Sequence, residues 1–97
     1  METSSVQDQI KISLTRDFEP VFIEVTDDSA RHRGHREASA GSSHFSVKLA
    51  AQAFNGMSLI KRHQAVYRTL DRFLKSGVHA LQMEILSAEE WHARRPG

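Results

Sequence analysis

The sequence SLIKRHQAVYRTLDRFLKSG, residues 58–77, holds the strongest helical pattern of the chain. Its inward positions recur every three or four residues, which is the spacing of one helix face. Ser58 is suited to cap the start of this helix, and Gly77 is suited to the left-handed conformation that often follows a helix end. The inward positions are Leu59, His63, Val66, Leu70 and Phe73. These signals predict a long helix that ends near residue 76 and forms the main support of the fold.

Three short segments alternate between apolar and polar residues, which is the two-residue period of a β-strand. The first strand follows Pro20, the second begins at His44 after a polar segment, and the third begins near His79. Their apolar positions are Val21, Ile23 and Val25, then Phe45, Val47 and Leu49, and finally Leu81, Met83 and Ile85. A sheet of three short strands is marginal unless one of its faces is covered. The helices are therefore expected to pack on the sheet.

Two further helices are predicted near the ends of the chain. Ser5 is suited to begin a helix that runs to about Arg16, because apolar residues recur there at every fourth position. The members of this apolar edge are Val6, Ile10 and Leu14. Ser87 and Glu90 have the spacing of a capping box, which opens a short last helix that docks Trp91. The predicted order is helix, strand, strand, helix, strand, helix, which defines an α+β fold.

The chain is short and nearly neutral, and it has no cysteine. Its 97 residues fit one domain over 1–97, with a short flexible tail at about 93–97. Thirteen Lys and Arg residues against 12 Asp and Glu residues give a net charge of +1, so no global basic field is present. No apolar run approaches the ~20 residues that cross a bilayer, and the start does not resemble a signal peptide, so a cytoplasmic protein is expected. Any metal ligands must be His, Asp or Glu.

A long polar loop is predicted over about 27–43, and it contains two of the six histidines. Loops longer than ~12 to 15 residues in compact domains often carry a functional site. His32 and His35 in this loop are either solvated or able to turn toward a metal ion. His79, at the start of the third strand, is equally compatible with a structural role and with metal ligation. The remaining histidines, which are expected to be structural or solvated, are His44, His63 and His92.

Basic residues on the long helix form a second candidate site. These basic residues are Lys61, Arg68, Arg72 and Lys75. The last three follow Lys61 by 7, 11 and 14 residues, and these spacings place all four within one narrow wedge of a helix. This basic stripe is either a solvated face or a contact for phosphates or an acidic partner, and Arg62 joins it as a candidate contact residue. The sequence has no nucleotide-binding glycine loop, HExxH motif or serine nucleophile elbow. A binding protein is therefore predicted rather than an enzyme.

Several motifs resemble, in order and spacing, those of the BolA family. They are GH at 34–35, GSSHFSV at 41–47, FNGMS at 54–58, RHQAVY at 62–67 and GVHAL at 77–81. Together they span about residues 34 to 81. The resemblance implies a three-stranded fold like the type II KH domain, with the element order predicted above.

The resemblance also implies a role as partner of a monothiol glutaredoxin, with a 2Fe-2S cluster bridged between the two proteins. Carried over residue by residue, the metal ligands are His35 and His79, with His32 as an alternative loop ligand. The glutaredoxin would supply its cysteine and the thiolate of bound glutathione, which agrees with a chain that has no cysteine. Such a complex would act in iron-sulfur cluster assembly or transfer, or in iron and redox regulation.

The same resemblance permits a second hypothesis, which is transcriptional regulation through DNA. In that case the basic stripe would contact the DNA. The FNGMS motif is not the GxxG loop with which KH domains clamp a nucleic-acid backbone, and the net charge of +1 also disfavours this hypothesis.

Overall fold

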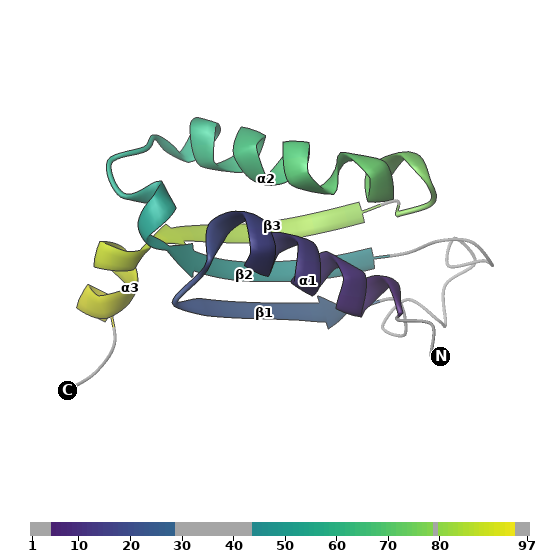
Figure 1. Ribbon diagram of the computed structural model, residues 1–97, viewed down its shortest axis with the longest axis horizontal. Helices are drawn as coiled ribbons and strands as arrows, with labels where there is room; N and C mark the ends of the chain where they lie inside the picture. Colours follow the sequence, from purple (N-terminus) through teal and green to yellow (C-terminus); the bar gives the residue numbers. More distant parts are fainter. Residues whose placement is uncertain (1–4, 29–43, 79, 95–97) are drawn as a thin grey trace.

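A computed structural model describes residues 5–28, 44–78 and 80–94. The predicted order of elements is confirmed, and a short 3-10 turn, η2, follows the second strand (Figure 1). The elements are α1 (Val6–Phe18), β1 (Phe22–Asp27), β2 (His44–Ala51), η2 (Gln52–Phe54), α2 (Leu59–Lys75), β3 (Ala80–Ser87) and α3 (Ala88–Arg94). The fold is therefore the predicted α+β fold with a three-stranded sheet. No helix within the described ranges is long and apolar enough to cross a membrane.

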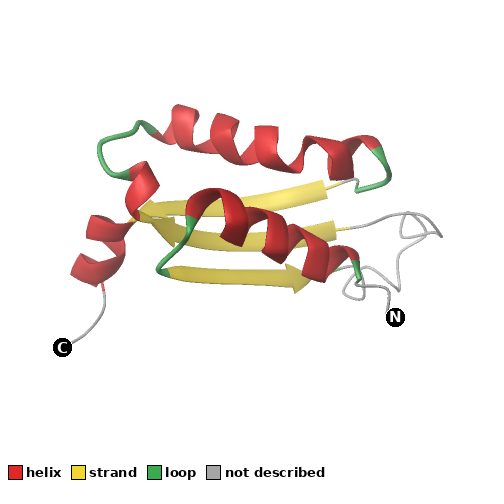
Figure 2. Cartoon of the chain, viewed as in Figure 1, coloured by secondary structure: helices red, strands yellow, loops and turns green. Residues whose placement is uncertain are grey.

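The sheet has the order β1-β2-β3, with β1 antiparallel to β2 and β2 parallel to β3. Helix α1 crosses in front of the sheet near β1 and β2, and α2 runs along the β3 side (Figures 1 and 2). Trp91 of α3 stacks on Phe22 of β1 with ring centroids 4.3 Å apart. Because Phe22 points to the face opposite Ile23 and Val25, α3 covers one end of the face that α1 and α2 leave open.

The core lies between the sheet and the two longer helices. The predicted inward residues of β2 are all buried, and Leu49 is 0% exposed. They pack in one cluster with inward residues of the two helices. The helix members of this cluster are Ile10, Leu14, Val66, Leu70 and Phe73. The alternation in β2 therefore predicted its buried face correctly. The helical spacing predicted the inward residues correctly except for the first member of each stripe, Val6 and Leu59, which are exposed.

Side chains cap the helices as the sequence predicts. The Ser5 hydroxyl accepts a hydrogen bond from the Asp8 amide at 3.1 Å, and the Ser58 hydroxyl accepts one from the Lys61 amide at 3.2 Å. Helix α2 ends one residue earlier than predicted, and Gly77 follows with a φ of 128°. Such a positive φ favours glycine because it has no Cβ.

Four local predictions differ from the structure. Val6, predicted on the apolar edge of the first helix, is 42% exposed at the start of α1. Helix α1 continues past Arg16 to Phe18, because the Phe18 ring packs on Phe54 with centroids 4.9 Å apart. Val21 is 45% exposed, since β1 begins one residue later. Leu59 is 63% exposed although the helical spacing places it on the inward side. In the first turns of α2, Arg62 is the buried residue instead.

Candidate functional site

The predicted metal ligands His32, His35 and His79 lie outside the described residues. The structure does describe the positions that flank them. Asp28 precedes the undescribed segment and donates its amide hydrogen bond to the His44 carbonyl at 2.7 Å. His44 in turn is paired in register with Ala80, the residue that follows position 79.

This pairing places three chain positions at one end of the sheet. Neighbouring strands lie ~4.8 Å apart, so Asp28, His44 and Ala80 are side by side at the right-hand end of the sheet in Figure 1. Both ends of the segment that contains His35, and the residue next to His79, therefore meet at this sheet end.

At this end of the sheet, Ser46 of β2 contacts β3 and the residue that follows β1. The Ser46 hydroxyl forms a hydrogen bond to the Asp28 carboxylate, and it lies 3.3 Å from the Gln82 amide oxygen. On the other side of position 79, the Val78 amide donates to the Phe73 carbonyl at 3.1 Å. The buried Val78 and strand β3 thus hold the backbone on both sides of position 79.

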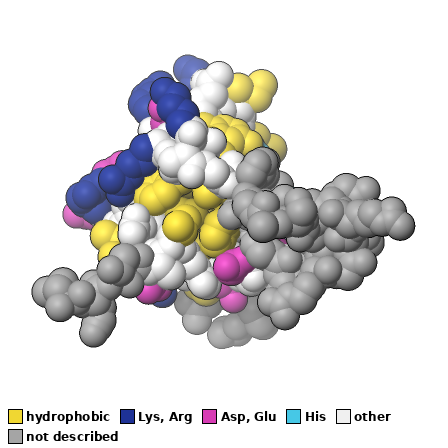
Figure 3. All heavy atoms as spheres, turned by 90° about the vertical axis from the view of Figure 1, so that its right-hand side faces the viewer, with side chains coloured by type: hydrophobic (Ala, Val, Ile, Leu, Met, Phe, Trp, Pro, Cys, Tyr) yellow, Lys and Arg dark blue, Asp and Glu magenta, His cyan; other side chains and the backbone are white. Residues whose placement is uncertain are grey.

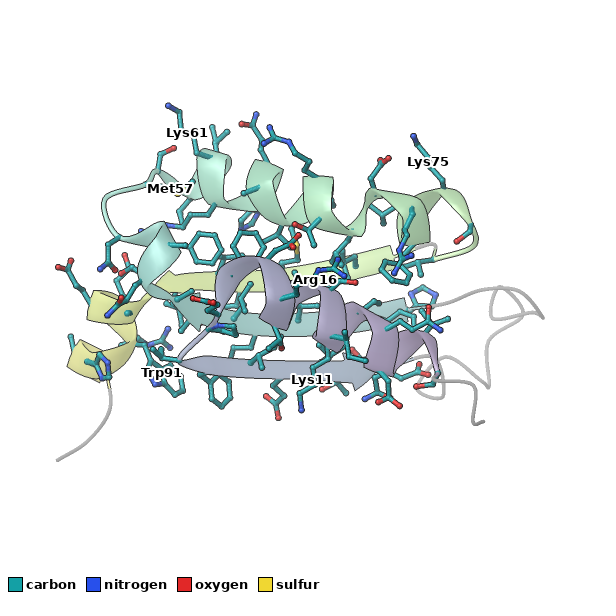
Figure 4. All side chains as sticks on the ribbon, viewed as in Figure 1. Lys11, Arg16, Met57, Lys61, Lys75 and Trp91 are labelled. Carbon is teal, nitrogen blue, oxygen red and sulfur yellow. The ribbon has the colours of Figure 1, made fainter. Side chains whose placement is uncertain are left out.

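The basic stripe of α2 is exposed, but its members differ in their partners. Lys75 lies 2.9 Å from Asp71, and their hydrogen bond raises the pKa of Lys75. The Arg72 guanidinium lies 4.7 Å from the Phe73 ring centroid. Lys61 and Arg68 have no ion-pair partner among the described residues. Figure 4 shows Lys61 and Lys75 pointing away from the sheet.

Arg62 does not belong to this exposed stripe, because it is 6% exposed and points toward β3 and α3. Its guanidinium donates to the Met57 carbonyl at 2.9 Å and to the Ile85 carbonyl at 3.2 Å. It also forms a two-pronged ion pair with Glu90, at 2.7 and 3.2 Å. The hydrogen bond from Arg62, helped by one from the Ser87 amide, lowers the pKa of Glu90 to about 2. Arg62 therefore joins three elements rather than facing a partner.

The capping box of α3 is confirmed and shares its carboxylate with this cluster. The Glu90 amide donates to the Ser87 hydroxyl at 3.0 Å, and the Ser87 amide donates to the Glu90 carboxylate at 3.0 Å. Glu90 therefore caps α3 and binds Arg62 with the same group. Trp91 follows on α3, and Lys48 lies 5.8 Å above its ring centroid.

One feature of the surface was missed in the sequence. Ile60 is 70% exposed and Tyr67 is 42% exposed, beside the basic residues Lys61 and Arg68. The sequence did contain a sign of this apolar pair, because Ile60 and Tyr67 are seven residues apart and out of phase with the inward stripe.

Within the described residues, no group of three His, Asp or Glu side chains could hold a metal ion. The predicted ligand set His35 and His79 thus stays a prediction.

Comparisons with known proteins place this architecture in a family. The family model for BolA-like proteins matches residues 14–90. The DNA-binding transcriptional regulator BolA of Escherichia coli K12 is 39% identical over 87 residues, which cover 89% of this chain and 79% of that protein. SufE-like protein 1 of Arabidopsis thaliana, named as chloroplastic/mitochondrial, is 39% identical over 80 residues. Those residues cover 77% of this chain, which spans 22% of that longer protein.

Solved structures agree with the sequence comparison. BolA1 from Arabidopsis thaliana superimposes with a TM-score of 0.79 at 32% identity, over 92% of this chain and 98% of the other. BolA1 from Mus musculus gives a TM-score of 0.77 at 27% identity, over 94% of this chain and 72% of the other. The fold is therefore that of a BolA-like domain. The chain belongs to the BolA family, as its motifs predicted.

The predicted cytoplasmic location of the protein stays a prediction, since plant relatives are named chloroplastic.

Proposed function

We propose that this protein pairs with a monothiol glutaredoxin and contributes histidine ligands to a 2Fe-2S cluster bridged between them. The observation that carries the proposal is the meeting of Asp28, His44 and Ala80 at one sheet end. These positions adjoin the segment that holds His35 and the position of His79. Family membership supports a binding role, and the complex would serve iron-sulfur cluster assembly or transfer, or iron and redox regulation.

The donor chemistry of the chain fits a shared cluster. The chain has six histidines and no cysteine, so it offers neutral imidazole nitrogen to iron and no thiolate. Two imidazoles leave two further protein positions, which the glutaredoxin cysteine and glutathione would fill. A cluster with two nitrogen ligands supplies a one-electron site of raised reduction potential, as in Rieske centres. The isolated chain is accordingly expected to hold no stable cluster.

The two ligands should differ in importance. His79 follows the anchored Val78 and precedes Ala80, which is already paired in the sheet. His35 lies between Asp28 and His44, away from either anchored position. Fixing each further residue of backbone costs ~1 to 2 kcal/mol of conformational entropy. His79 is therefore expected to be indispensable, whereas His35 is expected to be partly replaceable by His32.

The test is anaerobic co-reconstitution with a monothiol glutaredoxin, followed by visible circular dichroism. His79→Ala should abolish the cluster signal, and His35→Ala should weaken or alter it. His92→Ala is the matched control, because His92 is exposed on α3 at the opposite end of the sheet. A thermal melt of each variant alone separates ligand loss from unfolding. An unchanged spectrum for folded His79→Ala would contradict the ligand assignment.

A second candidate function is DNA binding by the basic stripe. Three bacterial relatives carry the name DNA-binding transcriptional regulator BolA. Lys61 and Arg68 are exposed, with no ion-pair partner among the described residues, so they are available to phosphates. DNA affinity would fall steeply with salt, whereas cluster-bridged pairing would depend on iron, sulfide and glutathione. Joint replacement of Lys61, Arg68, Arg72 and Lys75 by Gln tests the stripe, and the domain should remain folded.

A further inference from the structure

The outer face of α2 carries exposed apolar side chains that the fold does not use. Leu59 is 63% exposed, Ile60 is 70% exposed and Tyr67 is 42% exposed. Ile60 and Tyr67 are two helical turns apart, so they lie on one side of α2. Scattered single hydrophobic residues are ordinary on protein surfaces, but adjacent ones beside a polar rim are typical of interaction sites.

Two cations run parallel to this apolar pair. Lys61 and Arg68 are also two turns apart, and each directly follows one of the apolar residues in the sequence. Viewed along the sheet in Figure 3, basic side chains gather on one side of the top of the molecule, where α2 lies, and hydrophobic ones gather on the other. The helix therefore presents an apolar stripe and a basic stripe side by side.

A shallow hollow lies on the basic side of this face. Its volume is about 290 Å³, and its lining is partly apolar, through Met57 and Ala65, and partly basic, through Lys61 and Arg68. The small side chain of Ala65 leaves room between the two longer cations, which are one turn away on either side. An occupant of this hollow would meet apolar carbon below and positive charge at the rim.

We propose that this face, formed by Ile60, Lys61, Gln64, Tyr67 and Arg68 and called here the α2 docking face, binds an acidic amphipathic helix of a partner protein. Apolar side chains three, four and seven residues apart on the partner would cover Ile60 and Tyr67. Carboxylates beside them would pair with Lys61 and Arg68. The inference is independent of the proposed cluster, and it names the chemistry of an acidic partner for the basic stripe.

The same charges argue against two other occupants. A second copy of this chain would bring its own Lys61 and Arg68 against the first pair, and like charges facing each other are destabilising. A nucleic-acid backbone would satisfy the cations but would leave Ile60 and Tyr67 without apolar partners. An acidic amphipathic helix uses both stripes at once.

The α2 docking face also lies away from the sheet end where the proposed cluster ligands adjoin. Figure 4 labels Lys61 near the end of α2 that faces α3, and Lys75 near the other end. In Figure 1, strand β1 ends and strand β2 begins near the C-terminal end of α2. Binding at the docking face can therefore be measured without a cluster.

The experiment is a titration of ¹⁵N-labelled protein, followed by amide chemical shifts. The probe is a designed helical peptide of about 20 residues, with leucines on one stripe and glutamates beside them. A matched peptide carries lysine in place of glutamate, and a short DNA duplex is the third probe. The expected result is binding of the acidic peptide with shifts centred on residues 57–68, weakened by salt, and no binding of the basic peptide.

Variants of the protein separate the two stripes. Ile60→Ser with Tyr67→Ser should lower peptide affinity by at least about tenfold. Ile12→Ser is the matched control, since Ile12 is 56% exposed on α1, and it should change affinity less than about twofold. Lys61→Gln with Arg68→Gln should lower affinity by about tenfold at low salt and flatten the salt dependence.

Several results would overturn the inference. These are no peptide binding at about 1 mM, equal binding of the acidic and basic peptides, shifts confined to the sheet end, or equal losses for the Ile12 and Ile60 variants. DNA binding that needs the cations but not Ile60 or Tyr67, without peptide binding, would also overturn it. Failure of the wild-type protein to assemble a cluster with glutaredoxin would instead contradict the proposed function and leave the peptide result standing.

Discussion

Replacing Arg62 by methionine tests whether this residue is structural. Methionine keeps most of the buried aliphatic stem but removes the guanidinium that donates to the Met57 and Ile85 carbonyls. The buried Ile85 carbonyl, left without a donor, costs ~1 to 3 kcal/mol, and the part-buried Met57 carbonyl adds up to about 1 kcal/mol because water can reach it, so the free energy of unfolding should fall by about 1 to 4 kcal/mol. The Glu90 carboxylate adds little to this figure, because its side chain is 46% exposed and water can replace the lost partner.

The assay is urea denaturation at pH 7. A domain of this size has a free energy of unfolding of roughly 5 to 15 kcal/mol, so the variant should still fold at 25 °C with a lower midpoint. Arg68→Met is the matched control, since Arg68 is exposed on the same helix, and it should change stability by less than ~0.5 kcal/mol. A stability loss below ~0.5 kcal/mol for Arg62→Met, together with weaker partner or DNA binding, would refute the structural assignment.

Three further predictions concern the packing of the helices. The hydrogen bond from Arg62 lowers the pKa of Glu90 to about 2 from 4.5. The stability that ionised Glu90 gives the folded protein is therefore complete above pH 4.5 and is lost as the pH falls toward 2. Fluorescence of Trp91, the single tryptophan, should report this loss, and Glu90→Gln should remove the pH dependence. Trp91→Ala removes the stack on Phe22 and should lower the unfolding free energy by ~1 to 2 kcal/mol in urea. Leu70 is 1% exposed, so Leu70→Ala should lower the free energy of unfolding by ~2 to 5 kcal/mol. Leu59 is 63% exposed, so Leu59→Ala should lower it by less than ~0.5 kcal/mol. Equal losses of stability for the two variants would contradict the orientation of α2.

Local patterns predicted most of the fold because they depend on neighbouring residues. Alternation identified the buried side of β2, and the caps at Ser5, Ser58 and Ser87 lie where their spacing predicted. The first turns of α2 were harder, since Leu59 and Arg62 both lie close to the inward stripe. Which of them is buried depends on the Ile85 carbonyl and Glu90, which are 23 and 28 residues further along the chain. Periodicity carries no information about such distant partners.

The candidate site shows the same limit more strongly. The sequence identified a histidine-containing segment and a separate histidine, but it did not show that their surroundings meet. That meeting requires β2 to lie between β1 and β3, and to run parallel to β3. His44 and Ala80 are neighbours only because of this strand order, which depends on pairing between distant segments. The family resemblance supplied what the spacing could not.

Adjacent residues in the first turns of α2 have separate tasks because a helix turns about 100° per residue. Lys61 points outward toward solvent, and Arg62 points inward to hold β3 and α3 at the far end of the sheet from Asp28. Because Arg62 and Glu90 fix α2 at that end, the outer stripe of Ile60 and Lys61 is held on a rigid helix. A docking surface with this support loses little entropy when a partner binds, which favours affinity from a small contact area.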